Sequence, residues 1–178
     1  MTTAEYLATP ETVKPQELAY GVLRVADSPL PIHQQAVADL FRALDAHVRG
    51  HMLGRVWLAP LDVILDYDAA LVVQPDLFFI SNARAEIVTD RVRGAPDLVV
   101  EVLSPHPRVG VLAKRLEWFA HYGVRECWLL HQFERRLEIL HFDDGQGTLR
   151  QTFHTQESIY STVLPNFHES LDAILSSW

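Results

Sequence analysis

Residues 96–105 read PDLVVEVLSP, and this stretch decides the fold class of the chain. Its central part, Leu98–Leu103, is apolar at every position except Glu101. Uniformly apolar runs of this length are typical of strands that are covered on both faces. A helical pattern over residues 110–122 and a second apolar run, Glu126–His131, follow along the chain. The uniform runs imply a buried central sheet, and the order of strand, helix and strand indicates an α/β or α+β domain with a mixed sheet.

The rest of the chain adds one long helix and several short strands. From Ile32 to about Val48, apolar residues recur at intervals of three and four, which predicts an amphipathic helix. Strands are expected at residues 17–20, 21–26, 56–58, 62–65, 71–80, 136–142 and 149–153, and a closing helix at 167–175. The predicted fold class is therefore α/β, in the form of an α+β domain with a central mixed β-sheet flanked by helices. We expect residues 1–178 to form a single domain.

The composition excludes disordered and membrane-spanning classes of protein. Of the 178 residues, 48% are hydrophobic and 21% are charged, as in an ordinary globular core. No apolar run approaches the roughly 18–20 residues that span a bilayer, and the first residues carry no export signal, so we expect a cytoplasmic protein. The net charge of −8 argues against broad electrostatic attraction to nucleic acid but allows a local binding site.

Two acidic residues stand inside apolar strand segments. Glu101 interrupts the run Leu98–Leu103, and Asp76 lies within VVQPDLFF, residues 72–79. Burying an ionised carboxylate costs several kcal/mol unless it is paired or binds a metal, so two such acids on neighbouring strands could hold Mg²⁺ or Mn²⁺. The alternative is a structural role, in which each acid caps a helix or pairs with an arginine. Asp97, which follows Pro96, is expected at an exposed position or in a turn.

Other chemistry-bearing residues give weaker signals. His47 and His51 have the i, i+4 spacing that can ligate zinc, although no HExxH motif surrounds them, so a zinc-dependent hydrolase is a third hypothesis. The single cysteine, Cys127, lies in an apolar run and is expected to be a small buried hydrophobe rather than a nucleophile. The glycines are dispersed, so no phosphate-binding loop can be assembled, and Ser104 lacks a GxSxG motif.

Several motifs occur together along the chain. They are Glu17-Leu18 before Gly21, His33-Gln34, VQPD at residues 73–76, APDLVVEVLSP at residues 95–105 and YGVRECWL at residues 122–129. In this order and spacing they resemble the Uma-type restriction endonucleases, a branch of the PD-(D/E)XK nuclease superfamily. The block PDLVVEVLSP followed by GVRECW is the specific part of this resemblance.

The resemblance implies a restriction-endonuclease-like core and a metal-dependent site. In such a site Asp76 is the first acid and Glu101 the second, and together they bind Mg²⁺ or Mn²⁺. Glu17 matches an amino-terminal acid that can complete the metal site. The resemblance also implies a DNA substrate and a homodimer.

The expected lysine is where this sequence departs from the superfamily pattern. The usual position, two residues after Glu101, holds Leu103, and in the Uma type the cation lies eight residues before the glycine of the GV motif, which is Arg115 here. Lys114 is its neighbour, but only Arg115 shares a helical face with Phe119 and other apolar residues. We therefore predict that Arg115, rather than Lys114, points toward the acids.

Two functions follow from these residues. The first is a divalent-metal-dependent endonuclease that hydrolyses DNA phosphodiester bonds, with Asp76 and Glu101 as ligands and Arg115 or Lys114 stabilising the developing charge. The second is a catalytically inactive nuclease-fold protein that serves as a binding or assembly module. An arginine at the lysine position favours the second function because it cannot exchange a proton as a tuned lysine can.

Overall fold

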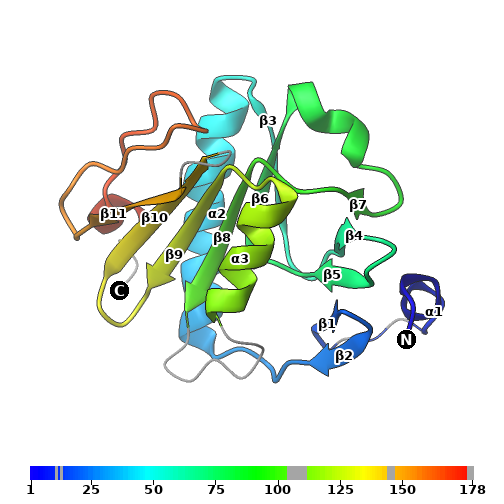
Figure 1. Cartoon of the computed structure of the whole chain (residues 1–178). Helices are drawn as coiled ribbons and strands as arrows, with labels where there is room; N and C mark the ends of the chain where they lie inside the picture. The colour runs from blue at the N-terminus through cyan, green and yellow to red at the C-terminus, as the bar shows by residue number, and fades with distance from the viewer. Residues whose placement is uncertain (11, 13, 104–111, 144–146, 176–178) are drawn as a thin grey trace.

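The computed structural model describes residues 1–10, 12, 14–103, 112–143 and 147–175, and its centre is a six-stranded mixed sheet (Figure 1). The strand order is β11-β10-β9-β8-β6-β3. The bounds of these strands along the chain are β3 Gly54–Leu58, β6 Leu77–Ser81, β8 Leu98–Leu103, β9 Glu126–His131, β10 Arg136–Asp143 and β11 Gly147–Phe153.

Helices cover both faces of this sheet. Figure 1 shows α2, Pro31–Gly50, behind the sheet and α3, Leu112–Tyr122, in front of it. Alternate side chains of β8 serve the two layers, because Val100 packs in the core under α2 and Val99 packs in the core under α3. Glu101 therefore lies on the α3 face of the sheet.

A second, five-stranded sheet lies beside the first. Its order is β2-β1-β5-β4-β7. The strands are β1 Gln16–Ala19, β2 Val22–Val25, β4 Val63–Asp66, β5 Leu71–Val73 and β7 Val92–Arg93. Three short helical segments complete the described elements: α1 Thr3–Leu7, the 3-10 helix η1 Asn82–Ile87 and α4 Leu171–Ile174.

The α+β fold class predicted from the sequence is confirmed at its centre. Strands β8 and β9 run parallel and are joined through α3, and β8 pairs antiparallel with β6, so the sheet is mixed. Helix α3 ends at Gly123, whose φ of 93° closes the helix in the left-handed conformation that glycine adopts without strain. Among the described helices, none combines the length and the hydropathy needed to cross a bilayer.

Two sequence expectations differ from the structure. Residues 71–80 do not form one strand, because Gln74, Pro75 and Asp76 separate β5 from β6, which belong to different sheets. Proline has no N–H to donate to a strand partner, so the run is interrupted at Pro75. The closing helix is also shorter than the predicted 167–175, since Phe167 is buried from an irregular segment before α4 begins at Leu171. Ser104 lies outside the described residues.

Candidate metal and phosphate site

Asp76 lies directly before β6, opposite Glu101 on the antiparallel neighbour β8. The register of β6 and β8 pairs Leu77 with Val100, so the preceding residue, Asp76, falls opposite Glu101. Residues directly opposite in an antiparallel pair project from the same face, with Cβ atoms about 4.5–5.5 Å apart. The Asp76 carboxylate is fixed there because its Oδ2 accepts a 2.7 Å hydrogen bond from the Val102 amide. The structure thus brings together the two acids that the sequence singled out.

Arg115 projects from the first turns of α3 into the space between two carboxylates. Its Nε donates a 2.7 Å hydrogen bond to Oε1 of Glu101, and its Nη1 lies 2.8 Å from both carboxylate oxygens of Glu17. The guanidinium carbon also lies 5.4 Å from the centre of the Phe119 ring. Lys114 is exposed on another face of the helix. The prediction that Arg115 and not Lys114 faces the acids is therefore confirmed.

Glu17 reaches this site from the smaller sheet. Glu17 lies on β1 and is 8% exposed. Its Oε1 accepts a 2.7 Å hydrogen bond from the backbone N–H of Gln74. Gln74 is part of the same three-residue segment that carries Asp76. Both sheets therefore contribute an acid to one cluster, and the Arg115 guanidinium joins them.

His33 is a member of the site that the sequence analysis did not assign. It lies in the first turn of α2, and its Nε2 is 3.3 Å from Oδ2 of Asp76. Burial lowers the pKa of His33, but the hydrogen bond and the negative charge of Asp76 outweigh it, so the pKa is raised above its usual value. The signal was present in the sequence as the His33-Gln34 motif, but nothing in that pair indicated its partner.

Glu101 holds its proton more tightly than an exposed glutamate. Burial is the largest cause and raises its pKa, Arg115 opposes this effect, and the neighbouring charges of Asp76 and Glu17 raise the pKa further, to about 7. The two adjacent carboxylates also raise the pKa of Arg115, although burial alone would lower it. Acids held together at an electrostatic cost are typical of sites that receive a cation or a substrate.

The donor set fits a small, oxygen-preferring cation with two protein ligands. Among the described residues, no three His, Cys, Asp or Glu side chains are grouped as a complete metal-binding set. Mg²⁺, however, is often held by one or two carboxylates, with water and substrate phosphate as the remaining ligands. Within the described part of the chain, Oδ1 of Asp76 and Oε2 of Glu101 accept no hydrogen bond, so each acid has one oxygen available. Glu17 is already engaged by Arg115 and Gln74.

Comparison with known proteins places this chain in a family. Residues 3–173 match the Uma2 family, which is described as "Putative restriction endonuclease". The chain belongs to the Uma2 family. No curated protein matches it. Among solved structures, the chain is similar to the crystal structure of a putative nuclease belonging to DUF820 from Anabaena variabilis ATCC 29413, with a TM-score of 0.81, 18% identity, and coverage of 99% of this chain and 98% of that one.

Asp97, the first of the two acids in the segment PDLVVEVLSP, has a structural role. It is 1% exposed and lies directly before β8, so the expectation of an exposed position was wrong. Its Oδ2 accepts a 2.8 Å hydrogen bond from the Ser81 amide, and Arg125 lies 3.6 Å from Oδ1. Asp97 therefore ties the end of β6 to the start of β8, the two strands that carry the candidate ligands.

The remaining candidates do not join the cluster. The ring centres of His47 and His51 lie 4.3 Å apart. A ring nitrogen of His47 lies within hydrogen-bond distance of the backbone carbonyl of Pro165, and a ring nitrogen of His51 lies within hydrogen-bond distance of the backbone carbonyl of His47. This arrangement leaves no support for the zinc-dependent hydrolase. Cys127 is fully buried, and burial raises the pKa of its thiol well above the usual value, so it packs as a hydrophobe, as predicted.

Proposed function

We propose that the protein is a divalent-metal-dependent endonuclease that hydrolyses DNA phosphodiester bonds. The observation that carries the proposal is the pair of opposed carboxylates, Asp76 and Glu101, each with one oxygen left available on the same face of the sheet. The family of the chain and its likeness to a nuclease fold agree with this chemistry.

Asp76 and Glu101 would hold Mg²⁺ or Mn²⁺ through their carboxylates. When bound, such a cation lowers the pKa of a coordinated water and polarises a phosphoryl oxygen. His33 fixes the orientation of Asp76 from the opposite side, through Oδ2. Val102 does the same through its amide, so the ligand oxygens are held before any cation arrives.

Arg115 supplies positive charge beside the position of the scissile phosphate. Its guanidinium can donate two hydrogen bonds to phosphate oxygens and stabilise the charge that develops on them. It stays protonated at every working pH, so it moves no proton in the reaction. Glu17 holds the guanidinium in place through Nη1 and acts as a positioning residue.

One observation favours a second candidate, the catalytically inactive binding or assembly module. The Arg115 guanidinium already bridges Glu17 and Glu101, so positive charge is built into the acid cluster without a metal. A permanently neutralised cluster would stabilise the fold and leave no role for a cation.

A cleavage assay separates the two candidates. We expect the full chain to nick supercoiled plasmid DNA when Mg²⁺ or Mn²⁺ is added, and to lose this activity in Asp76→Asn and in Glu101→Gln. Asp45→Asn is the matched control, because its side chain is as exposed as that of Asp76, 22%, and its partner is Arg49 on α2. Absence of metal-dependent nicking by the wild-type chain would favour the inactive module.

We also propose a homodimer, which the family resemblance implies. Among the described strands, β11 is an edge of the larger sheet, and its Leu149 is exposed. This supports the proposal because an edge strand can pair with a second copy of the same strand. Light scattering of the purified chain tests it: a mass twice the 20.2 kDa of the chain is expected, and a monomer mass at high concentration would contradict it.

A further inference from the structure

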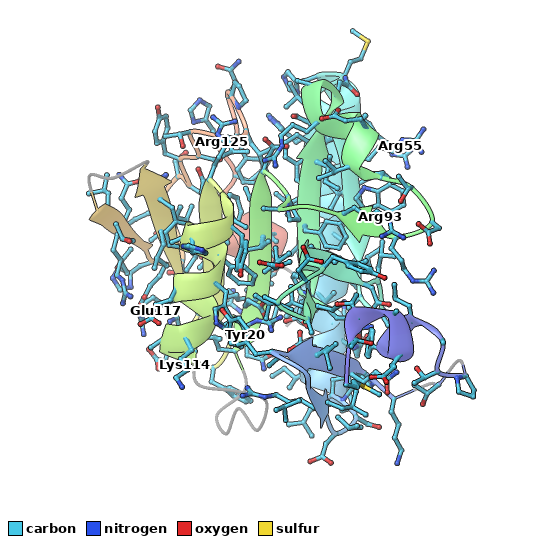
Figure 2. The ribbon with its side chains drawn as sticks, turned by 45° about the vertical axis from the view of Figure 1, so that its right-hand side comes forward. Tyr20, Arg55, Arg93, Lys114, Glu117 and Arg125 are labelled. Atoms are coloured by element: carbon cyan, nitrogen blue, oxygen red, sulfur yellow. The ribbon has the colours of Figure 1, made fainter. Side chains whose placement is uncertain are left out.

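An open groove lies between the β1–β2 hairpin and α3, next to the acid cluster. Its volume is ≈ 520 Å³, within the roughly 300–1,000 Å³ of typical ligand pockets. The residues that line it are Ala19, Tyr20, Arg24, Lys114, Glu117, Trp118 and His121. Figure 2 shows Tyr20, Lys114 and Glu117 gathered at one end of α3, with Arg125 toward the other end. Neither proposed ligand, Asp76 or Glu101, lines the groove.

Tyr20, an aromatic residue of the groove, lies in a tight turn whose positive φ is unfavourable for tyrosine. Tyr20 and Gly21 form the two-residue connection between β1 and β2, with φ angles of 49° and 81°. Turns of this kind favour asparagine, aspartate or glycine at the first position, so a tyrosine there carries a cost. The Tyr20 side chain is nevertheless 53% exposed, and its ring meets the Trp118 ring edge to face at 5.8 Å.

The groove is locally positive although the chain carries a net charge of −8. Arg24 and Lys114 supply two cations from its two walls, and Glu117 supplies the carboxylate that lines it. Within the described part of the chain, neither Arg24 nor Lys114 is held in an ion pair. Two cations without ion-pair partners among the described residues, beside the exposed ring of Tyr20 and the half-buried ring of Trp118, form the combination that binds phosphates and stacked bases.

We propose that this groove binds a segment of single-stranded DNA, with a base against the Tyr20–Trp118 pair and backbone phosphates at Arg24 and Lys114. The ring faces of bases are accessible in a single strand, whereas in a duplex they are stacked inside the helix. A groove that offers aromatic rings together with cations therefore fits a single strand better than a duplex, which would be gripped through its phosphates alone.

Both walls of the groove come from elements that also carry members of the acid cluster. Ala19 and Glu17 lie two residues apart on β1 and so share a face, and Arg24 is the direct cross-strand partner of Glu17. On the helix, Lys114 precedes Arg115. A strand held at Arg24 and Lys114 would therefore pass beside the acid cluster, so this inference rests on the proposed function and names its substrate as single-stranded.

The decisive variant, Tyr20→Asn, removes the aromatic ring and replaces it with a residue that adopts the turn's positive φ at lower cost. Tyr20→Asn suits the positive φ, so its melting temperature should equal or exceed that of the wild type. Fluorescence anisotropy of the full chain with a labelled oligothymidylate of roughly 12 nucleotides, in EDTA so that no cleavage occurs, measures binding. We expect Tyr20→Asn to weaken binding roughly 5- to 150-fold, the range for loss of one stacked base. The matched control is Tyr160→Ala, because Tyr160 is 52% exposed and lies outside the groove.

The cations are tested by the salt dependence of the same binding. Lys114→Ala should lower the slope of log affinity against log salt concentration by about 0.7, the value for one phosphate contact with a single strand. Arg55→Ala is the control, since Arg55 is exposed on β3, away from the groove in Figure 2. Its slope should match that of the wild type.

Three results would overturn the inference. They are undiminished binding by Tyr20→Asn, equal or tighter binding of a duplex of the same length, and tighter binding of the matching RNA oligonucleotide. The outcomes also separate the inference from the proposed function. If Tyr20→Asn leaves both binding and metal-dependent cleavage unchanged, only the proposal that the groove binds single-stranded DNA is rejected. If binding depends on the Tyr20 ring but no cleavage occurs, only the proposed nuclease function is rejected.

Discussion

The guanidinium of Arg115 donates a 2.7 Å hydrogen bond to the carboxylate of Glu101, from the helix that covers the strand on which Glu101 lies. Glu17 is held by the same guanidinium, and the side chains of Arg115, Glu17 and Glu101 are only 11–14% exposed. The positive charge of Arg115 therefore offsets the cost of burying the carboxylates of Glu17 and Glu101 in the folded protein.

Replacing Arg115 with methionine should destabilise the protein by about 3–5 kcal/mol, because it leaves two buried carboxylates without their partner. Urea denaturation measures this loss. Lys114→Met, on the exposed side of the same helix, should change stability by no more than about 0.5 kcal/mol. Adding Glu17→Gln to the Arg115 variant should restore part of the loss. A loss below about 1 kcal/mol for Arg115→Met would show that the acids are not held by this pair.

Metal affinity should rise with pH because a cation at Glu101 must displace a proton. Burial, with the charges of Asp76 and Glu17, raises the pKa of Glu101 to about 7 against the opposing effect of Arg115. Affinity for Mn²⁺ should therefore rise by up to roughly tenfold per pH unit below about pH 7 and level off above it. Calorimetry in two buffers of different ionisation enthalpy counts the protons released. No proton release near pH 6 would contradict a role for Glu101 as a ligand.

His33 should stabilise the protein mainly in acid. Burial alone would lower its pKa, but Asp76 raises it above the value in the unfolded chain. The stabilisation is therefore complete below the unfolded pKa of about 6.5 and is lost as pH rises through the folded pKa. Compared with the wild type, His33→Gln should lose more unfolding free energy at about pH 5.5 than at about pH 9. Equal losses at the two pH values would show that His33 acts by packing rather than by charge.

Glu126 should be the acid whose loss damages the fold without touching the candidate site. It is fully buried and accepts hydrogen bonds from Trp128 Nε1 at 2.6 Å, Ser161 Oγ at 2.7 Å and the Thr162 amide at 3.0 Å. In Glu126→Gln, an NH₂ group replaces one of the accepting oxygens and faces these donors. The substitution should lower the free energy of unfolding, measured by urea denaturation, by about 3 kcal/mol or more.

Two readouts complete this test. Glu86→Gln, at an exposed position, should leave stability unchanged. Mn²⁺ affinity should also be retained by the folded Glu126→Gln protein, and a parallel loss of metal binding would contradict the separation between this acid and the site.

The central part of the fold was predictable because its signals are local. The uniform run of β8, the helical period of α2 and the succession from β8 through α3 to β9 each follow from the hydropathy of neighbouring residues. The division of residues 71–80 between two sheets was not predictable in this way. Apolar residues at both ends of the run look alike, and only the pairing partners, Leu18 for Val72 and Val99 for Phe78, distinguish them.

The candidate site was predictable where a residue contradicted its surroundings. Asp76 and Glu101 are charged residues in apolar strands, and the shared helical face of Arg115 and Phe119 indicated which cation would meet them. His33 and the Gln74 amide gave no such signal. A histidine in the first turn of a helix is unremarkable in a sequence, and a backbone N–H is the same at every position, so their contacts depend on the tertiary fold alone.

The segment Gln74-Pro75-Asp76 connects the two sheets, and each sheet carries a different part of the site. Both candidate ligands, Asp76 and Glu101, are fixed on the larger sheet, whereas Glu17, Tyr20 and Arg24 belong to the β1–β2 hairpin of the smaller one. Substitutions at Tyr20 and Arg24, unlike substitutions at Glu17, which holds Arg115, can therefore accumulate without moving the carboxylates that would bind a cation. In evolutionary terms, a lineage could exchange Tyr20 and Arg24 to change what the protein binds while it keeps the acid cluster.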